Sequence, residues 1–149
     1  MNFFDSVGCK ASDHGLDFMV YCPANEKTVD KIIKKGLAGK TVTASEAEML
    51  KTELLQFCGK EYVRLGWAMQ IHYNCLRNPN TKMFNTLGPD TGFDCIGPNN
   101  GAAKVAKLLD SLYSTNSLPR TILYSLDAAD NAFLDTIIGA FQGSEIAGK

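Results

Sequence analysis

Apolar and polar residues recur along the chain with two different periods, and each period predicts one kind of element. A helix is predicted over residues 26–35, where apolar residues recur at helical spacing, and Gly36 is expected to end it. A longer helix is predicted over residues 44–65. Its start is indicated by Thr43 and Glu46, a capping-box pair in which a hydroxyl and a carboxylate each satisfy a free backbone N–H.

The long helix is predicted to bury one stripe of its surface, because apolar residues recur every three or four positions. The predicted stripe comprises Ala47, Leu50, Leu54, Phe57, Cys58, Tyr62 and Leu65. Gly66 is expected to end the helix. Two more helices are predicted, one over residues 102–113 and one that Asp127 caps and that runs to about residue 140.

Three strands are predicted between these helices, over residues 7–12, 67–74 and 120–126. The first strand is expected to lead into a loop at residues 13–15. In the second strand, alternation separates a bulky apolar face from a small polar face. The apolar face carries Trp67, Met69, Ile71 and Tyr73, and the polar face carries Ala68, Gln70, His72 and Asn74. Residues 76–100 are predicted to form a long loop, which is usually functional or disordered.

Strands that are each followed by a helix predict a parallel α/β fold. At 149 residues, the chain is the size of one domain, and residues 1–149 are read as a single unit. Periodicity alone leaves two architectures open, a doubly wound open sheet and part of a (β/α)8 barrel. In a barrel, the apolar face of the second strand would meet the helices and the polar face would point inwards.

The composition is that of a globular protein, with 45% hydrophobic and 21% charged residues and a formal net charge of −1. The densest basic cluster, Lys31, Lys34 and Lys35, lies on an amphipathic helix as a solvated face, so nucleic acid is not an expected partner. No signal-peptide pattern or membrane-spanning apolar run is visible, so no membrane partner is expected. Five scattered cysteines without a C-x-x-C pair are typical of a reducing cytoplasm.

His72 is the sharpest candidate for chemistry, because it lies near the end of a strand on its polar face. In α/β proteins the ligand site lies beyond the carboxyl ends of the strands, where imidazole can ligate a metal, bind a hydroxyl or move a proton. A structural, hydrogen-bonded histidine is the alternative. Asp13 and His14 form a second polar cluster, of which at most one residue faces the site if the strand continues. For Asp13, a turn-forming aspartate is the alternative.

The sequence contains no motif for metal binding, nucleotide binding or nucleophilic catalysis. Two histidines are a weak metal signal, since a catalytic zinc site takes three protein ligands, and neither H-x-H nor H-E-x-x-H occurs. Residues 87–97 lack the lysine of a P-loop, and no serine lies in a G-x-S-x-G context. No metal ligand is therefore assigned, and nothing indicates nucleophilic catalysis.

Several motifs in series resemble those of one family. Residues 66–72 (GWAMQIH), 76–80 (LRNPN) and 87–94 (LGPDTGFD) resemble the central region of uronate (glucuronate) isomerases. Residues 8–14 (GCKASDH) and 118–124 (LPRTILY) resemble the flanking segments, in the right order. The similarity covers nearly the whole chain, and motifs in series are far more specific than any single one.

The resemblance implies the amidohydrolase superfamily, a (β/α)8 barrel, and interconversion of glucuronate with fructuronate and of galacturonate with tagaturonate. It also implies a hexuronate substrate and, for the full-length family, a divalent metal, commonly zinc. His72 matches the family's active-site histidine in an H-x-x-x-L-R-N motif. Asp13 is carried over as a second catalytic residue, and Arg77, Asn78 and His14 are carried over as substrate-binding residues.

The family's metal-binding H-x-H and its acid on the last barrel strand have no counterpart in this sequence. A barrel needs about 250 residues, and the chain resembles the fourth to sixth strands with their helices. We therefore expect an internal fragment of a cytoplasmic uronate isomerase, inactive alone and prone to self-association through open sheet edges. Two alternatives stay open: a stand-alone non-catalytic α/β module that self-associates or binds a partner, and another amidohydrolase that performs metal-assisted hydrolysis.

Overall fold

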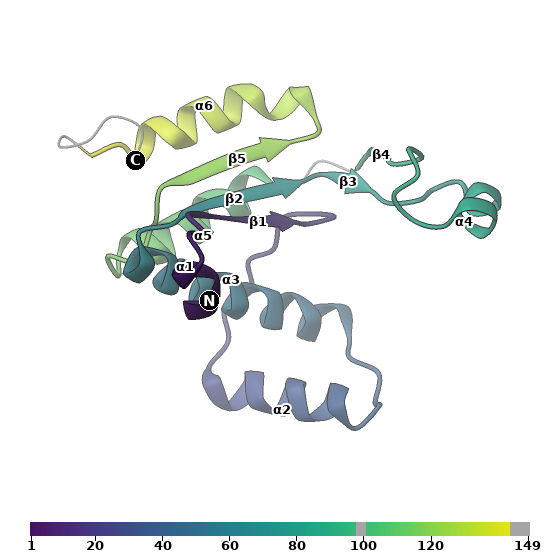
Figure 1. The fold of residues 1–149 in the computed structure, drawn as a ribbon, viewed down its shortest axis with the longest axis horizontal. Helices are drawn as coiled ribbons and strands as arrows, with labels where there is room; N and C mark the ends of the chain where they lie inside the picture. Colours follow the sequence, from purple (N-terminus) through teal and green to yellow (C-terminus); the bar gives the residue numbers. More distant parts are fainter. Residues whose placement is uncertain (98–100, 144–149) are drawn as a thin grey trace.

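The computed structural model describes residues 1–97 and 101–143 (Figure 1). Its strands are β1 (Ala11–Gly15), β2 (Ala68–Tyr73), β3 (Cys75–Leu76), β4 (Cys95–Ile96) and β5 (Thr121–Ser125). Three of them form one sheet in the order β1-β2-β5, and both neighbouring pairs are parallel. The other two, β3 and β4, form an antiparallel pair beyond the end of β2.

Helices precede, connect and follow these strands. They are α1 (Asn2–Ser6), α2 (Glu26–Leu37), α3 (Ala44–Leu65), α4 (Thr81–Leu87), α5 (Ala102–Tyr113), the 3₁₀ turn η1 (Ala128–Asp130) and α6 (Asn131–Ala140). In Figure 1, α5 lies behind the sheet, α6 runs beside β5, and α2 lies beyond α3. The α4 helix lies far from the sheet, at the tip of a projection that begins at β3.

One face of the sheet carries the hydrophobic core. Met69, Ile71 and Tyr73 alternate along β2 and are buried, so they all point to this face. The helices α3, α5 and α6 supply the other side of the core with Leu55, Tyr62, Val105, Leu108, Leu109, Leu112 and Leu134. These helices therefore pack against a single face of the sheet, as the apolar face of the second strand predicted.

The strand order distinguishes between the two architectures that the sequence left open. The strands lie side by side in chain order, and the helices that follow them pack on one face, as in a (β/α)8 barrel. A doubly wound sheet would reverse its order and carry helices on both faces. The predicted parallel α/β fold with three βα units is confirmed, and its winding is that of part of a barrel.

The first strand begins later than predicted. Residues 7–12 were expected to form it and residues 13–15 to form a loop, but β1 spans Ala11–Gly15 and the short helix α1 precedes it. The bounds of β1 are set by its parallel ladder with β2, in which Ala11 pairs with Ala68 and Gly15 with His72. Such pairing joins residues far apart in the chain, so local periodicity could not place it.

Two other predictions need correction. The helix predicted over residues 26–35 is α2, and it continues one residue past Gly36, to Leu37. The glycine that follows it in a left-handed conformation is Gly39, with φ 69°. The predicted loop at 76–100 contains α4 and the β3–β4 pair, while its residues 98–100 lie outside the described residues. These β-strands have two residues each, too short to give a periodic signal.

The buried stripe of α3 differs from the predicted one. Its buried residues are Thr52, Leu55, Gly59 and Tyr62. Leu54 and Phe57 are 52% and 56% exposed and line a groove between α2 and α3. The helix divides its apolar residues between the sheet and α2, so a single stripe was the wrong expectation. Its ends are confirmed: Thr43 and Glu46 form the capping box, and Gly66 ends the helix at φ 70°.

The contacts of Glu46 are expected to make the folded chain less stable in acid. Its carboxylate accepts hydrogen bonds from Lys35 Nζ at 2.7 Å and from the Thr43 backbone N–H at 2.8 Å. These contacts, Lys35 first, lower the pKa of Glu46 from 4.5 to about 2. A lowered folded-state pKa stabilises the fold above about pH 4.5, and this contribution is lost as the pH falls towards 2.

Glu46→Gln should therefore destabilise the chain at pH 7 and flatten the dependence of its stability on pH between about 4.5 and 2. Urea unfolding at several pH values measures this effect. Glu26→Gln, in the first turn of α2, removes the same charge at an exposed site and serves as the control. An unchanged pH dependence in Glu46→Gln would show that the capping box does not carry this effect.

Candidate functional site

Asp13, His72 and Tyr124 come from three neighbouring strands and meet on the face of the sheet opposite the core. His72 pairs with Gly15 of β1 and with Tyr124 of β5 in the two parallel ladders. Asp13 lies two residues before Gly15, so alternation brings it to the same face. His72 Nδ1 lies 2.7 Å from Asp13 Oδ1.

The hydrogen bond between Asp13 and His72 determines which ring nitrogen can face a ligand. In the neutral tautomer that donates its Nδ1–H to Asp13, Nε2 is an acceptor. Gly15, opposite His72, has no side chain to fill the space beside the ring. A Cβ on Gly15 would lie 3.4 Å from Arg77 Nη2, so glycine also leaves room for the guanidinium at this end of the strand.

A pocket of about 420 Å³ lies at the carboxyl ends of the strands, where ligand sites of parallel α/β proteins are found. Both predicted catalytic residues, Asp13 and His72, and one predicted substrate-binding residue, Arg77, line it together. The remaining lining residues are Gly15, Leu16, Tyr73, Cys75, Asp94 and Leu126. The pocket therefore combines two carboxylates, an imidazole and a guanidinium.

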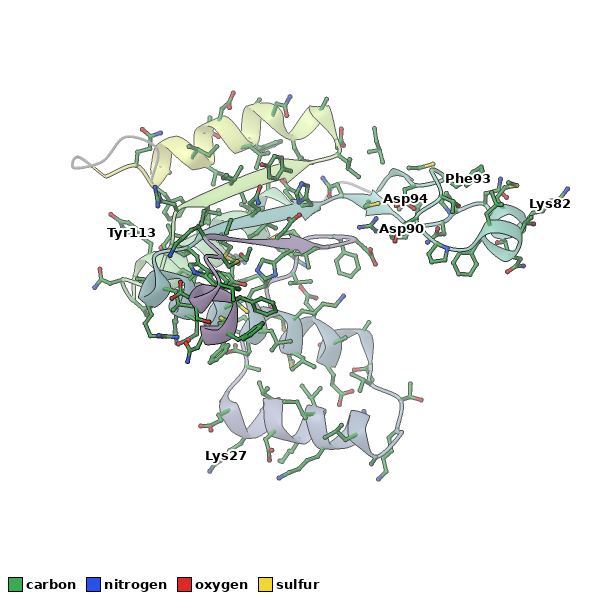
Figure 2. All side chains as sticks on the ribbon, viewed as in Figure 1. Lys27, Lys82, Asp90, Phe93, Asp94 and Tyr113 are labelled. Carbon is green, nitrogen blue, oxygen red and sulfur yellow. The ribbon has the colours of Figure 1, made fainter. Side chains whose placement is uncertain are left out.

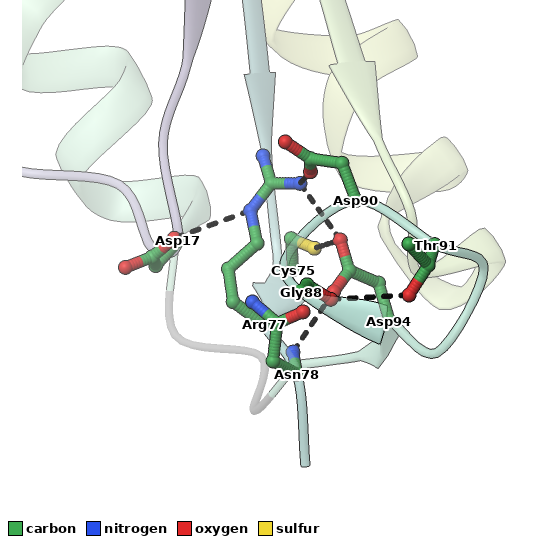
Figure 3. A network of polar contacts seen from close by, with 8 residues as sticks. All are labelled: Asp17, Cys75, Arg77, Asn78, Gly88, Asp90, Thr91 and Asp94. Atoms are coloured by element: carbon green, nitrogen blue, oxygen red, sulfur yellow. Dashed lines mark hydrogen bonds and ion pairs between the residues drawn. The ribbon is translucent and has the colours of Figure 1, made fainter. Parts of the chain in front are cut away.

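Arg77 belongs to a projecting segment, residues 75–97, which comprises β3, α4 and β4 and is called the arm below. Its guanidinium donates to Asp94 Oδ2 at 2.8 Å and lies 3.5 Å from Asp17 Oδ1 and 3.8 Å from Asp90 Oδ1 (Figure 3). The Asp94 hydrogen bond raises the pKa of Arg77 above its ordinary value. Figure 2 shows Asp90 and Asp94 on the part of the arm nearest the sheet. Arg77 thus links the arm to the segment after β1.

Asn78 fixes the same end of the arm through its backbone. Its N–H donates to Asp94 Oδ1 at 2.9 Å, and its φ is 47°. This hydrogen bond is the largest cause of the lowered pKa of Asp94, followed by that with Arg77. Asn78 itself is not among the residues that line the pocket. Asn78 is therefore connected to the pocket through Asp94 and does not line it.

His14 lies on the other face of β1 from Asp13. Its Nε2 is 3.1 Å from the hydroxyl of Tyr62 on α3, and burial lowers the pKa of the imidazole. It lines a separate pocket between β1 and α3. Adjacent residues of a strand point to opposite faces, so the side chain of His14 points away from the pocket that Asp13 and His72 line. This direction does not support the predicted role of His14 in substrate binding. Asp13 is the residue of the two that faces His72.

Asn74 departs most from its predicted position. It was expected on the polar face with His72, but β2 ends at Tyr73 and Asn74 is fully buried with φ 67°. Its Nδ2 donates to Ser125 Oγ at 2.9 Å and to Asp130 Oδ2 at 2.7 Å. This cluster joins the ends of β2 and β5 to η1 and turns the chain towards the arm.

Several residues around the site carried no assignment from the sequence. Asp94 lies within one of the family motifs, but its contact with Arg77 joins residues 17 positions apart. Tyr124 could have been found by alternation along β5, because it shares a face with Ile122 and is opposite His72. Asp130 had no signal in the sequence, where Asp127 was predicted to cap the last helix. The side chain of Asp127 caps η1 instead, and α6 begins only at Asn131, after Asp130.

The described residues do not form a complete metal site. No group of three or more His, Cys, Asp or Glu side chains that could hold an ion occurs within residues 1–97 and 101–143. His72 could offer Nε2 as one ligand, with Asp13 orienting the ring as a metal-bound histidine requires. A catalytic zinc ion takes three protein ligands, so these residues by themselves do not fit the metal. Within the same ranges, no helix is long and apolar enough to span a membrane.

The fold and pocket define a class of protein: a parallel α/β chain, wound like part of a barrel, with a pocket at the carboxyl ends of its strands. The family model described as glucuronate isomerase matches residues 1–149, so the chain belongs to the glucuronate isomerase family. The resemblance inferred from the motifs is thereby confirmed.

Relatives and solved structures agree with this membership. A uronate isomerase of Caldicellulosiruptor bescii is 56% identical over 147 residues, which are 99% of this chain and 32% of the relative. One from Lachnoclostridium phytofermentans is 46% identical over 149 residues, also 32% of its length. The crystal structure of uronate isomerase from Thermotoga maritima matches 94% of this chain and 31% of its own, with a TM-score of 0.85 and 29% identity. The chain thus spans about a third of these relatives.

Proposed function

We propose that this chain forms one wall of the active site of a uronate isomerase, which interconverts glucuronate with fructuronate and galacturonate with tagaturonate. The observation that carries the proposal is the hydrogen-bonded pair of Asp13 and His72 in a pocket with Arg77, in a chain of the glucuronate isomerase family. The relatives named above are uronate isomerases, and a hexuronate is the substrate class that their name implies for this pocket.

Aldose–ketose isomerisation moves a proton between neighbouring carbons through an enediol-like intermediate. His72 suits this task, because imidazole can accept and return a proton near neutral pH. Asp13 holds Nδ1, which directs the Nε2 lone pair away from β1 and towards the pocket. In this proposal His72 is the catalytic residue, and Asp13 sets its tautomer.

Arg77 is the group in the pocket suited to the carboxylate of a hexuronate, because a guanidinium binds a carboxylate through two parallel hydrogen bonds. Its short bond to Asp94 orients the guanidinium, while the longer ion pairs with Asp17 and Asp90 can be exchanged for the substrate. Asn78 contributes by holding Asp94 through its backbone. His14 is not part of the proposed site.

The chain alone is proposed to be inactive, because three strands do not close a barrel. The divalent metal implied for the family, commonly zinc, would supply Lewis-acid polarisation of substrate oxygens when bound, and the described residues do not supply a full set of ligands for it. The sheet face without helices exposes Ile122 and Tyr124, and the proposal includes self-association of the isolated chain through this face and the sheet edges. The five free cysteines suit a cytoplasmic location.

A chimera tests the proposal directly. The 147 matched residues of this chain replace the corresponding third of the Caldicellulosiruptor bescii relative, to which they are 56% identical. Ketose formation from glucuronate and galacturonate is then measured, with zinc added, for the chimera, the unaltered relative and the isolated chain. Turnover by the chimera and relative, but not by the chain, is the expected result.

An inactive chimera that folds like the relative would contradict the proposed function. Turnover by the isolated chain would contradict the proposal that it is incomplete. Sedimentation of the same preparation of the chain tests self-association: larger species are expected, and a compact monomer at all concentrations would oppose it.

A further inference from the structure

The ring of Tyr124 lies flat against the imidazole of His72. The two ring centroids are 4.2 Å apart, and the ring planes differ by 4°. The two residues are directly paired in the ladder between β2 and β5, and alternation brings both side chains to the face opposite the core. Tyr124 therefore covers one flat side of the imidazole.

The hydroxyl of Tyr124 is held at a second point. It donates a hydrogen bond to Gln70 Oε1 at 2.9 Å. Gln70 lies two residues before His72 on the same face of β2. The far end of the tyrosine ring is thus tied to the strand that carries His72, and the ring cannot swing away without losing this hydrogen bond.

His72 needs a restraint of this kind. Its side chain is 46% exposed, and the terminal torsion of a histidine side chain is broad. Asp13 holds the ring only at Nδ1, so the imidazole could still pivot about that one hydrogen bond. A flat ring stacked against it opposes the pivot, because tilting the imidazole would break the parallel contact with Tyr124.

We propose that Tyr124 is a positioning residue whose stacked ring fixes the plane of the His72 imidazole, while Asp13 fixes its tautomer; the hydroxyl bond to Gln70 plays the smaller part. This inference rests on the proposed function, in which His72 Nε2 moves the substrate proton. Tyr124 acts through His72, so its loss should lower kcat and leave KM nearly unchanged. Misplacing a reacting group by about 1 Å can cost about 10²-fold in rate.

The kinetic test compares two substitutions in the chimera. Tyr124→Leu removes the ring and should lower kcat by about 10- to 100-fold with KM within about twofold. Tyr124→Phe keeps the ring and should retain at least about a third of kcat, since the stack remains.

Tyr113→Leu is the matched control. Tyr113 has a similar exposure to Tyr124, 46% against 39%, but it contacts Phe141 at the C-terminal end of α6, so no change in kcat is expected. An unaltered kcat in Tyr124→Leu, or equal losses in the Leu and Phe variants, would overturn the proposal.

A spectroscopic test separates this proposal from the proposed function, because it needs no turnover. The chain has only two histidines, so its ¹⁵N-labelled imidazoles can be assigned by comparison with His14→Gln. The carbon-bound ring protons of His72 should be shifted upfield by the stacked ring in the wild type and in Tyr124→Phe. This shift should vanish in Tyr124→Leu, while the Nδ1–H tautomer persists.

The two tests together give distinguishable failures. Loss of the upfield shift in Tyr124→Leu beside an inactive chimera would support the stack and contradict the isomerase assignment. An active chimera beside a chain whose His72 ring protons do not respond to Tyr124→Leu would contradict the positioning role and leave the isomerase assignment standing.

Discussion

Changing His72 to Asn in the chimera is expected to lower kcat for both hexuronates by about 10²- to 10⁴-fold, the range over which positioned general acid–base groups act. Asparagine keeps a polar side chain on the same face of β2 but has no group that titrates near neutral pH. The loss should appear mainly in kcat, because the proposed role of His72 lies in proton movement. Steady-state ketose formation with saturating substrate measures it.

The second histidine supplies the matched control. His14 lies on the opposite face of β1 and contacts Tyr62, so His14→Asn removes the same side chain without entering the pocket. We expect kcat to change by less than about threefold and the free energy of unfolding to fall by about 1 kcal/mol, the worth of one hydrogen bond. If His14→Asn reduced kcat as much as His72→Asn, the assignment of the pocket face would be wrong.

Changing Asn74 to Ala is expected to lower the free energy of unfolding of the chain by about 3 kcal/mol. About 2 kcal/mol of this comes from lost hydrogen bonds, because Asn74 donates to both Ser125 and Asp130, and Asp130 is a buried carboxylate. About 1 kcal/mol more comes from the backbone, because alanine tolerates a φ of 67° less well than asparagine. Urea unfolding at pH 7 measures the total.

Asn78 offers a control with the same backbone geometry and a different environment. Its φ is 47°, and its contact with Asp94 uses the backbone N–H, which alanine keeps. Asn78→Ala should therefore cost only about 1 kcal/mol, the backbone part. Asn74→Gly, which removes the backbone penalty, should still lose about 2 kcal/mol. If Asn74→Gly were as stable as the wild type, the buried cluster would contribute nothing to stability.

His72 and Asn74 lie two positions apart and serve different roles, one in the pocket and one in the fold. His72 ends the exposed polar face, whereas Asn74 two positions later is fully buried and turns the chain into the arm. The turn brings Arg77 back over the strand ends, where it meets Asp94 and lines the pocket with His72. A loss of the Asn74 cluster should therefore also loosen the pocket wall that Arg77 forms.

The sequence by itself determined the features that depend on neighbours in the chain. The capping box of Thr43 and Glu46, the left-handed end at Gly66 and the alternation through Met69 and Ile71 are all written within a few residues, and all three are found in the structure. Motifs in series identified the family, and the polar face of β2 indicated His72. Short-range periodicity carries such information because backbone geometry fixes which residues share a face.

Only the tertiary structure decided which side chains meet. Asp13 and His72 are 59 residues apart, and their contact depends on the register between β1 and β2. That register also decides that Asp13 rather than His14 faces the pocket, since a shift of one residue would exchange them. The stack of Tyr124 on His72 needs the third strand in place. The physical reason is that parallel strands are joined by long crossovers, so paired residues lie far apart in the chain. Packing of the whole sheet selects their pairing, and no short stretch of sequence encodes it.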